Sequence, residues 1–338
     1  MKAKKIIGWT GCVIAALAVA GFVACKMFLW TGYQGDEPRW IYVHGGETEE
    51  GLKATLGSEL GTAGERAATL WSLFGGDVAK AHGAYRIAPG SSPARIYRML
   101  KNGAQTPVKL TFNNIRTMGQ LAARVAECVE ADSAAFMAAC DSVLPPLGFK
   151  RAEYAAAFLP DTYEFYWTSS PEKIVERLSG FRNSFWNDDR RAKAKALGLT
   201  PVQVATVASI AEEETNDRQE RGIVARLYLN RVHKGMKLQA DPTVKYAVGD
   251  FALRRITGAH LGVNSPYNTY RVEGLPPGPI RVAAAATLDA VLDSKPHDYL
   301  YMCAKEDFSG RHNFAKDYAT HQENARRYHK ALNARGIK

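Results

Sequence analysis

Cysteine is scarce in this chain, and the short motifs that cysteine, histidine and serine form in many hydrolases are missing. Five of the 338 residues are cysteine, and no C-x-x-C pair occurs, so a disulfide framework is excluded. The eight histidines include no H-E-x-x-H motif, which argues against a zinc peptidase or amidase. G-x-S-x-G is also absent, which argues against a serine hydrolase. We therefore expect no metal and no cofactor.

Acidic residues are fewer than basic ones, 34 against 44, and the net charge is +10. No basic run with interleaved aromatic residues occurs, so we expect no nucleic acid partner. A mildly basic protein suits an anionic bilayer surface or an acidic polymer, although solvated lysine and arginine explain most of this charge. An apolar fraction of 46% excludes global disorder, and the length suggests about two domains.

Charge is absent from residues 6–25, which follow Lys2, Lys4 and Lys5. A run of this length can cross a hydrocarbon core, and the basic flank places the N-terminus in the cytoplasm. Cleavage as a signal peptide and lipidation at Cys25 are the alternatives. The apolar run resumes after Lys26, which favours an uncleaved transmembrane anchor that contacts the lipid bilayer through residues 6–25.

A strand, a glycine turn and a helix are predicted twice in residues 34–107. The first copy begins at residues 41–43 with Gly46, and the second at residues 85–87 with Gly90. From residue 108 onward the pattern is mainly helical. Helices are expected over 117–129, 133–144, 171–186, 201–214 and 220–234, with a strand at 108–112 and a solvated linker or helix face at 188–195. Cys128 and Cys140 are expected either to pair or to remain buried thiols.

Three consecutive glutamates, Glu212, Glu213 and Glu214, end the alanine-rich helix predicted over 201–214. The negative end of the helix dipole, like-charge neighbours and partial burial all raise a carboxyl pKa. A carboxyl that is neutral near pH 7 can protonate a glycosidic oxygen. Glu212 continues a stripe of small side chains that leaves room for a groove. A solvated acidic helix end is the alternative interpretation.

Two later segments carry the side chains that sugar-binding grooves require. They read QADPT at 239–243 and SPYNTY at 265–270, and a rigid LPPGP follows at 275–279. Tyrosine, asparagine, glutamine and threonine combine polar groups with stacking surfaces, and proline holds such loops rigid. Ordinary turn chemistry is the alternative for each segment alone.

Taken in order, these motifs resemble the YceG-like family of membrane-anchored endolytic murein transglycosylases. The resemblance covers roughly residues 38–335. The matching segments are EEET at 212–215, NR at 230–231, QADPT at 239–243, SPYNTY at 265–270 and GLPPG at 274–278, with FLPDTY at 158–163, DYLY at 298–301 and GRHNF at 310–314. The resemblance implies an α+β architecture in three parts. These are a cytoplasmic tail and anchor at 1–33, a small LysM-like α/β region at 34–107, and a mainly helical, lysozyme-like catalytic domain with a small sheet at 108–338.

The resemblance also implies an activity, which is cleavage of the β-1,4 bond from N-acetylmuramic acid to N-acetylglucosamine in nascent peptidoglycan strands. The products end in 1,6-anhydromuramic acid. The family's catalytic glutamate maps to Glu212, acting first as acid and then as base, and Glu214 is implied as a supporting residue on the substrate side. Glu213 departs from the family's usual basic residue and is expected to add negative charge beside Glu212. The family further implies an extracytoplasmic domain held at the bacterial inner membrane and a partnership with peptidoglycan synthases.

Substrate-binding residues are predicted from the two loop motifs. Sugar contacts are assigned to Gln239, Tyr267, Asn268 and Tyr270. Asp241, Thr243 and Thr269 are also assigned to the substrate-binding site, with Asp241 and Thr243 expected to shape its loop. His312, His321 and His329 are expected on a loop and on exposed helix.

Two other functions remain open from the sequence. A hydrolytic muramidase would use the same glutamate and need a second acid, either Asp241 or Asp161. A non-catalytic peptidoglycan-binding scaffold would keep the LysM-like region and tolerate loss of Glu212.

Overall fold

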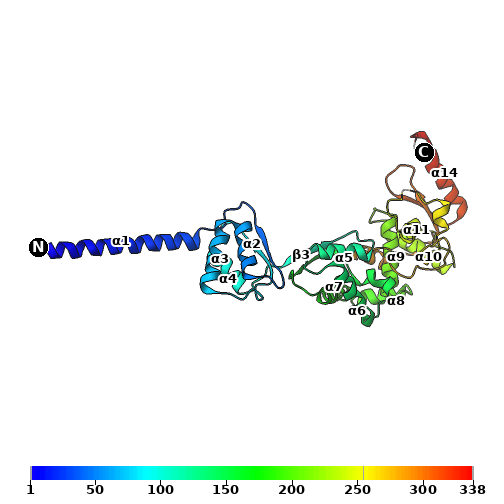
Figure 1. Ribbon diagram of the computed structural model, residues 1–338. Helices are drawn as coiled ribbons and strands as arrows, with labels where there is room; N and C mark the ends of the chain where they lie inside the picture. The colour runs from blue at the N-terminus through cyan, green and yellow to red at the C-terminus, as the bar shows by residue number, and fades with distance from the viewer. Residues whose placement is uncertain (1, 254, 337–338) are drawn as a thin grey trace. The chain divides into compact units, whose positions relative to one another are not determined.

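The computed structural model describes the backbone of residues 2–253 and 255–336, and the side chains of these residues from 15 onward except that of residue 24. Within these residues the chain divides into two compact units (Figure 1). Unit 1 comprises 1–109 with 128–130 and 164–169, and unit 2 comprises 110–127, 131–163 and 170–338. Both units mix helices with two-stranded sheets, so the predicted α+β class is confirmed at this level.

The predicted anchor lies in helix α1 (Lys2–Trp30). Side chains 6–14 and 24 of that segment are outside the described residues. Among the residues described, no single helix is long and apolar enough to cross a membrane. One bent pair, α8 (Asp188–Ala196) with α9 (Pro201–Glu214), is long and apolar enough when the two helices are taken together.

Unit 1 is built on the predicted repeat of strand, glycine turn and helix. β1 (Arg39–Val43) leads through Gly46 to α2 (Glu49–Leu60), and β2 (Gly83–Ile87) leads through Gly90 to α4 (Pro93–Lys101). Both glycines have φ near 78°, a left-handed conformation that other residues rarely adopt. The two strands pair antiparallel, with Ile41 opposite Tyr85. An additional helix, α3 (Thr62–Phe74), stands between the two copies.

Apolar side chains from both copies meet in one core. Its largest fully buried members include Leu52, Leu56, Trp71, Tyr85 and Ile96. Two residues at the end of α1, Phe28 and Leu29, pack against this core. The end of α1 is therefore fixed to unit 1 by burial of apolar surface.

The remaining elements belong to unit 2, except that residues 108–109 of β3 and 164–165 of β4 are counted in unit 1. They are β3 (Val108–Phe112), α5 (Met118–Ala126), α6 (Ser133–Val143), the 3-10 helices η1 (Pro145–Leu147) and η2 (Arg151–Ala157), β4 (Asp161–Phe165), α7 (Pro171–Phe185), α8 (Asp188–Ala196), α9 (Pro201–Glu214), α10 (Arg221–His233), α11 (Asp241–Val248), α12 (Gly258–Leu261), α13 (Ala285–Leu292), β5 (Tyr301–Ala304), β6 (His312–Ala315) and α14 (Tyr318–Ala334). β3 pairs with β4, and β5 pairs with β6. Residues 188–195, expected as a linker or helix face, form most of helix α8.

Helix α9 is the central element of unit 2. It begins with a capping box, in which the Thr200 hydroxyl accepts from the backbone of Gln203 and the Gln203 side chain accepts from the backbone of Thr200. Every residue from Val204 to Ala211 is buried. α10 and α13 both pack against it. The small side chains of α9 therefore serve close helix packing, and its charged end at 212–214 is held in a fixed place.

Candidate active site

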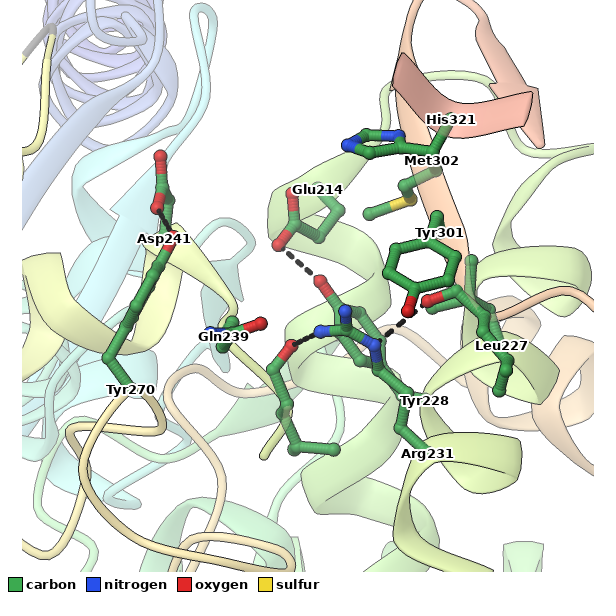
Figure 2. Close-up of a pocket in the computed structure, with 12 residues that line it drawn as sticks. Glu214, Leu227, Tyr228, Arg231, Gln239, Asp241, Tyr270, Tyr301, Met302 and His321 are labelled. Carbon is green, nitrogen blue, oxygen red and sulfur yellow. Dashed lines mark hydrogen bonds between the residues drawn. The ribbon is translucent and has the colours of Figure 1, made fainter. Parts of the chain in front are cut away.

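A pocket of about 340 Å³ opens in unit 2 at the C-terminal end of α9 (Figure 2). It receives side chains from α9, α10, the segment 238–241, the loop 265–270, β5 and α14. The lining residues are Glu214, Leu227, Tyr228, Arg231, Leu238, Gln239, Asp241, Tyr270, Leu300, Tyr301, Met302 and His321. Acidic, aromatic and amide groups therefore converge around one cavity, as in many ligand sites.

Glu214 is the acidic group of this pocket that comes from α9. Its Oε1 accepts a hydrogen bond of 2.6 Å from the Tyr228 hydroxyl, drawn as a dashed line in Figure 2. Burial raises the pKa of Glu214 to about 7, and the negative charge of Asp241 acts in the same direction, while the Tyr228 hydrogen bond opposes both. A large fraction of Glu214 is therefore protonated at neutral pH, as proton donation requires.

Glu212 lies elsewhere, against the beginning of α13. Its Oε2 accepts hydrogen bonds from the Thr287 hydroxyl at 2.7 Å and from the backbone N–H of Ala284 at 3.0 Å. Guanidinium nitrogens of Arg281 and Arg221 lie 3.3 and 3.8 Å from its two oxygens. Ala284 is the N-cap of α13, so the Glu212 carboxylate occupies the positive end of that helix dipole. Glu212 thus joins α9 to α13 and does not line the pocket.

In the described structure, no groove lies beside Glu212 along the small residues of α9, where the sequence predicted one. Ala205 and Ala208 are buried, and the Ser209 hydroxyl is fully buried where it accepts a hydrogen bond from the backbone N–H of Ile280 at 3.0 Å. The stripe of small residues is therefore covered by protein. This corrects the interpretation that the stripe leaves room for substrate, because small side chains also permit close packing of backbone on a helix.

Glu213 is neutralised by two arginines. Arg116 forms a bidentate pair with it at 3.0 Å for each bond, and Arg281 donates a further bond of 2.8 Å. The expectation that Glu213 adds uncompensated negative charge beside Glu212 is therefore wrong. No local pattern signals this pairing, since Arg116 and Arg281 are distant from Glu213 along the chain.

Three of the predicted loop residues, Gln239, Asp241 and Tyr270, do line the pocket. The Tyr270 hydroxyl donates a hydrogen bond of 2.6 Å to Asp241. Gln239 adopts a positive φ of 52°, and its backbone N–H donates to the carbonyl of Thr269 at 3.1 Å. Asp241 begins helix α11, so the predicted loop 239–243 continues directly into a helix.

Thr243, Thr269 and Asn268 are buried and hold the two loops together. The Thr243 and Thr269 hydroxyls lie 2.8 Å apart, and the Thr269 hydroxyl accepts from the backbone of Ala240 at 3.0 Å. The Asn268 amide donates to the carbonyls of Leu261 and Val263 at 2.9 and 2.8 Å. Thr243 and Thr269 therefore hold the loops together, a role expected for Thr243, whereas Thr269 was predicted to bind substrate. Asn268, predicted to contact sugar, is fully buried and bonded to protein, so that prediction is corrected.

Tyr267 also lies apart from the pocket. Its ring packs 4.7 Å from that of Tyr246, and its hydroxyl donates to the carbonyl of Ala152 at 3.3 Å. Its predicted sugar contact is not supported by this position. Asp161, named as one possible second acid, lies on β4 and does not line the pocket either.

Several pocket residues were not assigned from the sequence. Arg231 and Tyr301 lie in motif segments, yet only packing shows that they share a wall, where the guanidinium lies 5.4 Å from the ring centroid. Tyr228 and Met302 carry no local signal. His321, expected on exposed helix, is partly buried and lines the pocket. That expectation is corrected because α14 packs against β5 and β6.

Within the described residues, no group of three or more histidine, cysteine, aspartate or glutamate side chains could hold a metal ion. Cys140 is a buried free thiol, one of the two alternatives for this residue, and burial raises its pKa to about 12.

Comparison with known proteins places these features in context. A family model described as the YceG-like family matches residues 41–327. A Bacillus subtilis protein named endolytic murein transglycosylase is 35% identical over 170 residues, which cover 50% of this chain and 46% of that protein. A Streptococcus pneumoniae protein of the same name is 27% identical over 169 residues, which cover 49% of this chain and 30% of that protein. The matches thus span less than half the length of these relatives.

A solved structure shows the same fold. It is a yceG-like protein from Listeria monocytogenes, 24% identical in sequence, with a TM-score of 0.58. The match covers 86% of this chain and 99% of that chain.

Proposed function

The chain belongs to the YceG-like family, and from this premise we propose that it is an endolytic peptidoglycan transglycosylase. It cleaves the β-1,4 bond from N-acetylmuramic acid to N-acetylglucosamine and leaves 1,6-anhydromuramic acid ends. The names of the curated relatives support the reaction class. The pocket at the end of α9 supplies a carboxyl group suited to the chemistry.

The observation that carries this proposal is the environment of Glu214. It lines the pocket, and burial raises its pKa to about 7. Glu212, two residues earlier, is bonded to Thr287, Ala284 and Arg281 away from the pocket. We therefore assign the proton donor to Glu214, and Glu212 to the junction of α9 with α13.

The reaction needs one proton donor and no added water. Protonated Glu214 gives its proton to the glycosidic oxygen, and positive charge develops at C1 of the muramic sugar. The substrate's N-acetyl group shields C1 until the C6 hydroxyl attacks it. The hydroxyl loses its proton in this step, and Glu214, now a carboxylate, accepts it. The enzyme thereby returns to its starting protonation state.

Gln239 and Tyr270 are the predicted sugar-contacting residues that remain consistent with the structure. Both line the pocket with Glu214. The Tyr270 ring is held by its bond to Asp241, so a stacking surface is preorganised. A hydrolytic muramidase would need a second acid beside Glu214. Asp241 lines the same pocket and is the residue that would take this role.

The position of the enzyme in the cell is also part of the proposal. We assign α1 as a single-pass anchor in the bacterial inner membrane, with both units outside the cytoplasm and unit 1 acting as a LysM-like region. Exposed Leu17, Val19 and Phe22 on α1 support an apolar helix that needs a lipid partner. Such tethering favours nascent strands and contact with peptidoglycan synthases.

Mass spectrometry of digested peptidoglycan tests the function. The full-length protein in detergent is compared with Glu214→Gln and Glu212→Gln. We expect internal fragments with 1,6-anhydromuramic ends from the wild type and from Glu212→Gln. Glu214→Gln should lose at least a hundredfold in rate, since general acid catalysis contributes about that much or more.

Other outcomes identify the alternatives. Loss of cleavage with Glu212→Gln, and not with Glu214→Gln, would return the acid role to Glu212. Reducing ends would mean hydrolysis and make Asp241 the second acid. Strand binding without cleavage by any of the three proteins would favour the scaffold.

A further inference from the structure

His321 occupies the wall of the pocket opposite Asp241 and Tyr270. It comes from α14, and Figure 2 shows its ring directed into the space over Glu214, with Met302 beneath it. The ring stacks on that of Tyr301, with centroids 5.4 Å apart and planes inclined by 24°. Stacking on a strand residue fixes the ring in one orientation.

One nitrogen of this ring is sealed from solvent and bonded to nothing in the described structure. Nδ1 of His321 is buried without a hydrogen-bond partner. The other nitrogen, Nε2, lies at the far end of the ring, which is the end that reaches into the pocket. An imidazolium would bury an N–H donor at Nδ1 without an acceptor, and such a group is costly. The neutral tautomer with its proton on Nε2 buries neither a charge nor an N–H donor at Nδ1, and leaves only an unpaired acceptor there.

The surrounding charges favour the same neutral form. Burial lowers the pKa of His321, and the nearby cation Arg231 lowers it further. The other titratable groups around the pocket are the carboxyls of Glu214 and Asp241 and the hydroxyls of Tyr228, Tyr270, Tyr301 and Tyr318. His321 therefore presents one N–H donor to the cavity near pH 7.

This donor sits beside an apolar surface. Met302 and the ring of Tyr301 lie on the same side of the pocket as His321 (Figure 2). A sugar hydroxyl gains little from such a surface, because it has no apolar part to bury. An acetamido group has both parts that fit, a carbonyl oxygen that accepts a hydrogen bond and a methyl group that prefers apolar contact.

We propose that His321 recognises an acetamido group of the glycan, with its Nε2–H donating to the carbonyl oxygen while Met302 and Tyr301 contact the methyl group. This inference rests on the proposed function for its substrate class. It assigns the wall formed by β5 and α14 as the surface that distinguishes N-acetylated glycans from other β-1,4-linked glycans.

Equilibrium binding tests the assignment without depending on catalysis. The probes are tetra-N-acetylchitotetraose, called chitotetraose below, and cellotetraose. Both are neutral and β-1,4-linked, and every sugar of the first carries an acetamido group where the second carries a hydroxyl. The full-length Glu214→Gln protein in detergent is expected to bind chitotetraose about tenfold more tightly, the value of one hydrogen bond with its apolar contact.

Variants of His321 in the same background locate the discrimination. His321→Phe keeps the stacking ring and removes the donor, so the preference for chitotetraose should disappear. His321→Gln restores a donor near Nε2 and should restore most of the preference. His329→Phe is the matched control, since His329 is an exposed histidine on the same helix, and it should leave the preference unchanged.

Several results would overturn the proposal. They are equal binding of both tetraoses by the parent protein, no binding of either, and persistence of the preference in His321→Phe. Circular dichroism of each variant shows whether the fold is retained. Anhydromuramic product formation by the wild type is measured separately, so failure of the activity and failure of the acetamido assignment are distinguishable.

Discussion

At the scale of single residues, the two glutamates at the end of α9 illustrate how environment separates identical side chains. Glu214 and Glu212 lie two positions apart on one helix. Glu214 meets a cavity and a tyrosine hydroxyl, whereas Glu212 meets arginine, threonine and a helix N-terminus. Burial is the largest effect on the first and raises its pKa, while the second has the partners of a structural carboxylate.

Tyr228 sets the alkaline limit of the proposed activity. Its hydroxyl lowers the pKa of Glu214, so Tyr228→Phe should raise that pKa. Activity requires protonated Glu214 and therefore falls as pH rises through about 7 in the wild type. In Tyr228→Phe the fall should move to higher pH. The measurement is kcat/KM against pH, and Tyr166→Phe, which changes an exposed tyrosine, is the control. If the alkaline fall of kcat/KM in Tyr228→Phe stays at the same pH or moves to lower pH, the assignment is contradicted.

Glu214 should also make stability depend on pH. Its pKa is raised in the folded state from 4.5 to about 7, so the folded chain binds more protons than the unfolded chain in that window. Stability contributed by this group is complete below pH 4.5 and declines as pH rises toward 7. Glu214→Gln has no such dependence.

The Tm of Glu214→Gln relative to wild type should therefore increase between pH 5 and pH 8. Differential scanning calorimetry at the two pH values measures the Tm of Glu214→Gln minus the Tm of the wild type. If this difference stays constant or decreases between pH 5 and pH 8, the wild-type carboxyl is not held in its neutral form.

At the scale of elements, unit 2 depends on side chains that close helix ends and loops. Glu212 accepts from the N-terminal residues of α13, and Asn268 bridges two carbonyls that precede its own loop. Neither group lines the pocket. Substitution of either residue should therefore lower stability, and any loss of activity should follow from the lost stability.

Glu212→Ala should lower the free energy of unfolding by about 2–4 kcal/mol, because it removes the α13 cap and leaves Arg281 with one fewer carboxylate. Urea denaturation of unit 2 measures the change. The surface variant Glu323→Ala, which breaks an exposed pair with Arg326, should change stability by less than about 0.5 kcal/mol. Equal effects of the two variants would exclude the capping role.

Asn268→Ala should destabilise the fold by about 1–3 kcal/mol, since two carbonyls lose their donor. The exposed pocket residue Gln239 offers the contrast, and Gln239→Ala should weaken glycan binding with little change in Tm. Thermal denaturation and chitotetraose binding of both variants test this. A binding loss at unchanged Tm in Asn268→Ala would instead support its original assignment as a sugar contact.

At the scale of the whole molecule, the proposed role requires that α1 hold the chain at a bilayer. On α1, Leu17 is 67% exposed and Phe22 is 70% exposed. Replacing both with lysine should abolish flotation with anionic liposomes, because each charge at mid-helix costs about 3 kcal/mol in lipid. Leu73→Lys, on the exposed face of α3 in unit 1, should float as the wild type does. Retained flotation of the double variant would rule out the anchor.

The sequence by itself determined the local elements of this protein and its family. The capping box at Thr200, the helix start at Ser92 and the glycine turns at 46 and 90 are interactions between near neighbours, so their signals are complete in the chain. The order of the loop motifs identified the family in the same way. The same motifs predicted Gln239, Asp241 and Tyr270 as site residues, although the sequence did not show that they line one pocket.

The tertiary structure decided which side chains meet. Whether Glu212 or Glu214 faces a cavity depends on where α10 and α13 pack against α9, and small residues along α9 are compatible with either a groove or close packing. Arg116, Arg281 and His321 reach the end of α9 from distant segments, and no local pattern encodes that approach. The pKa values, the pairing of charges and the acetamido-facing wall are consequences of burial, and burial is a property of the folded chain.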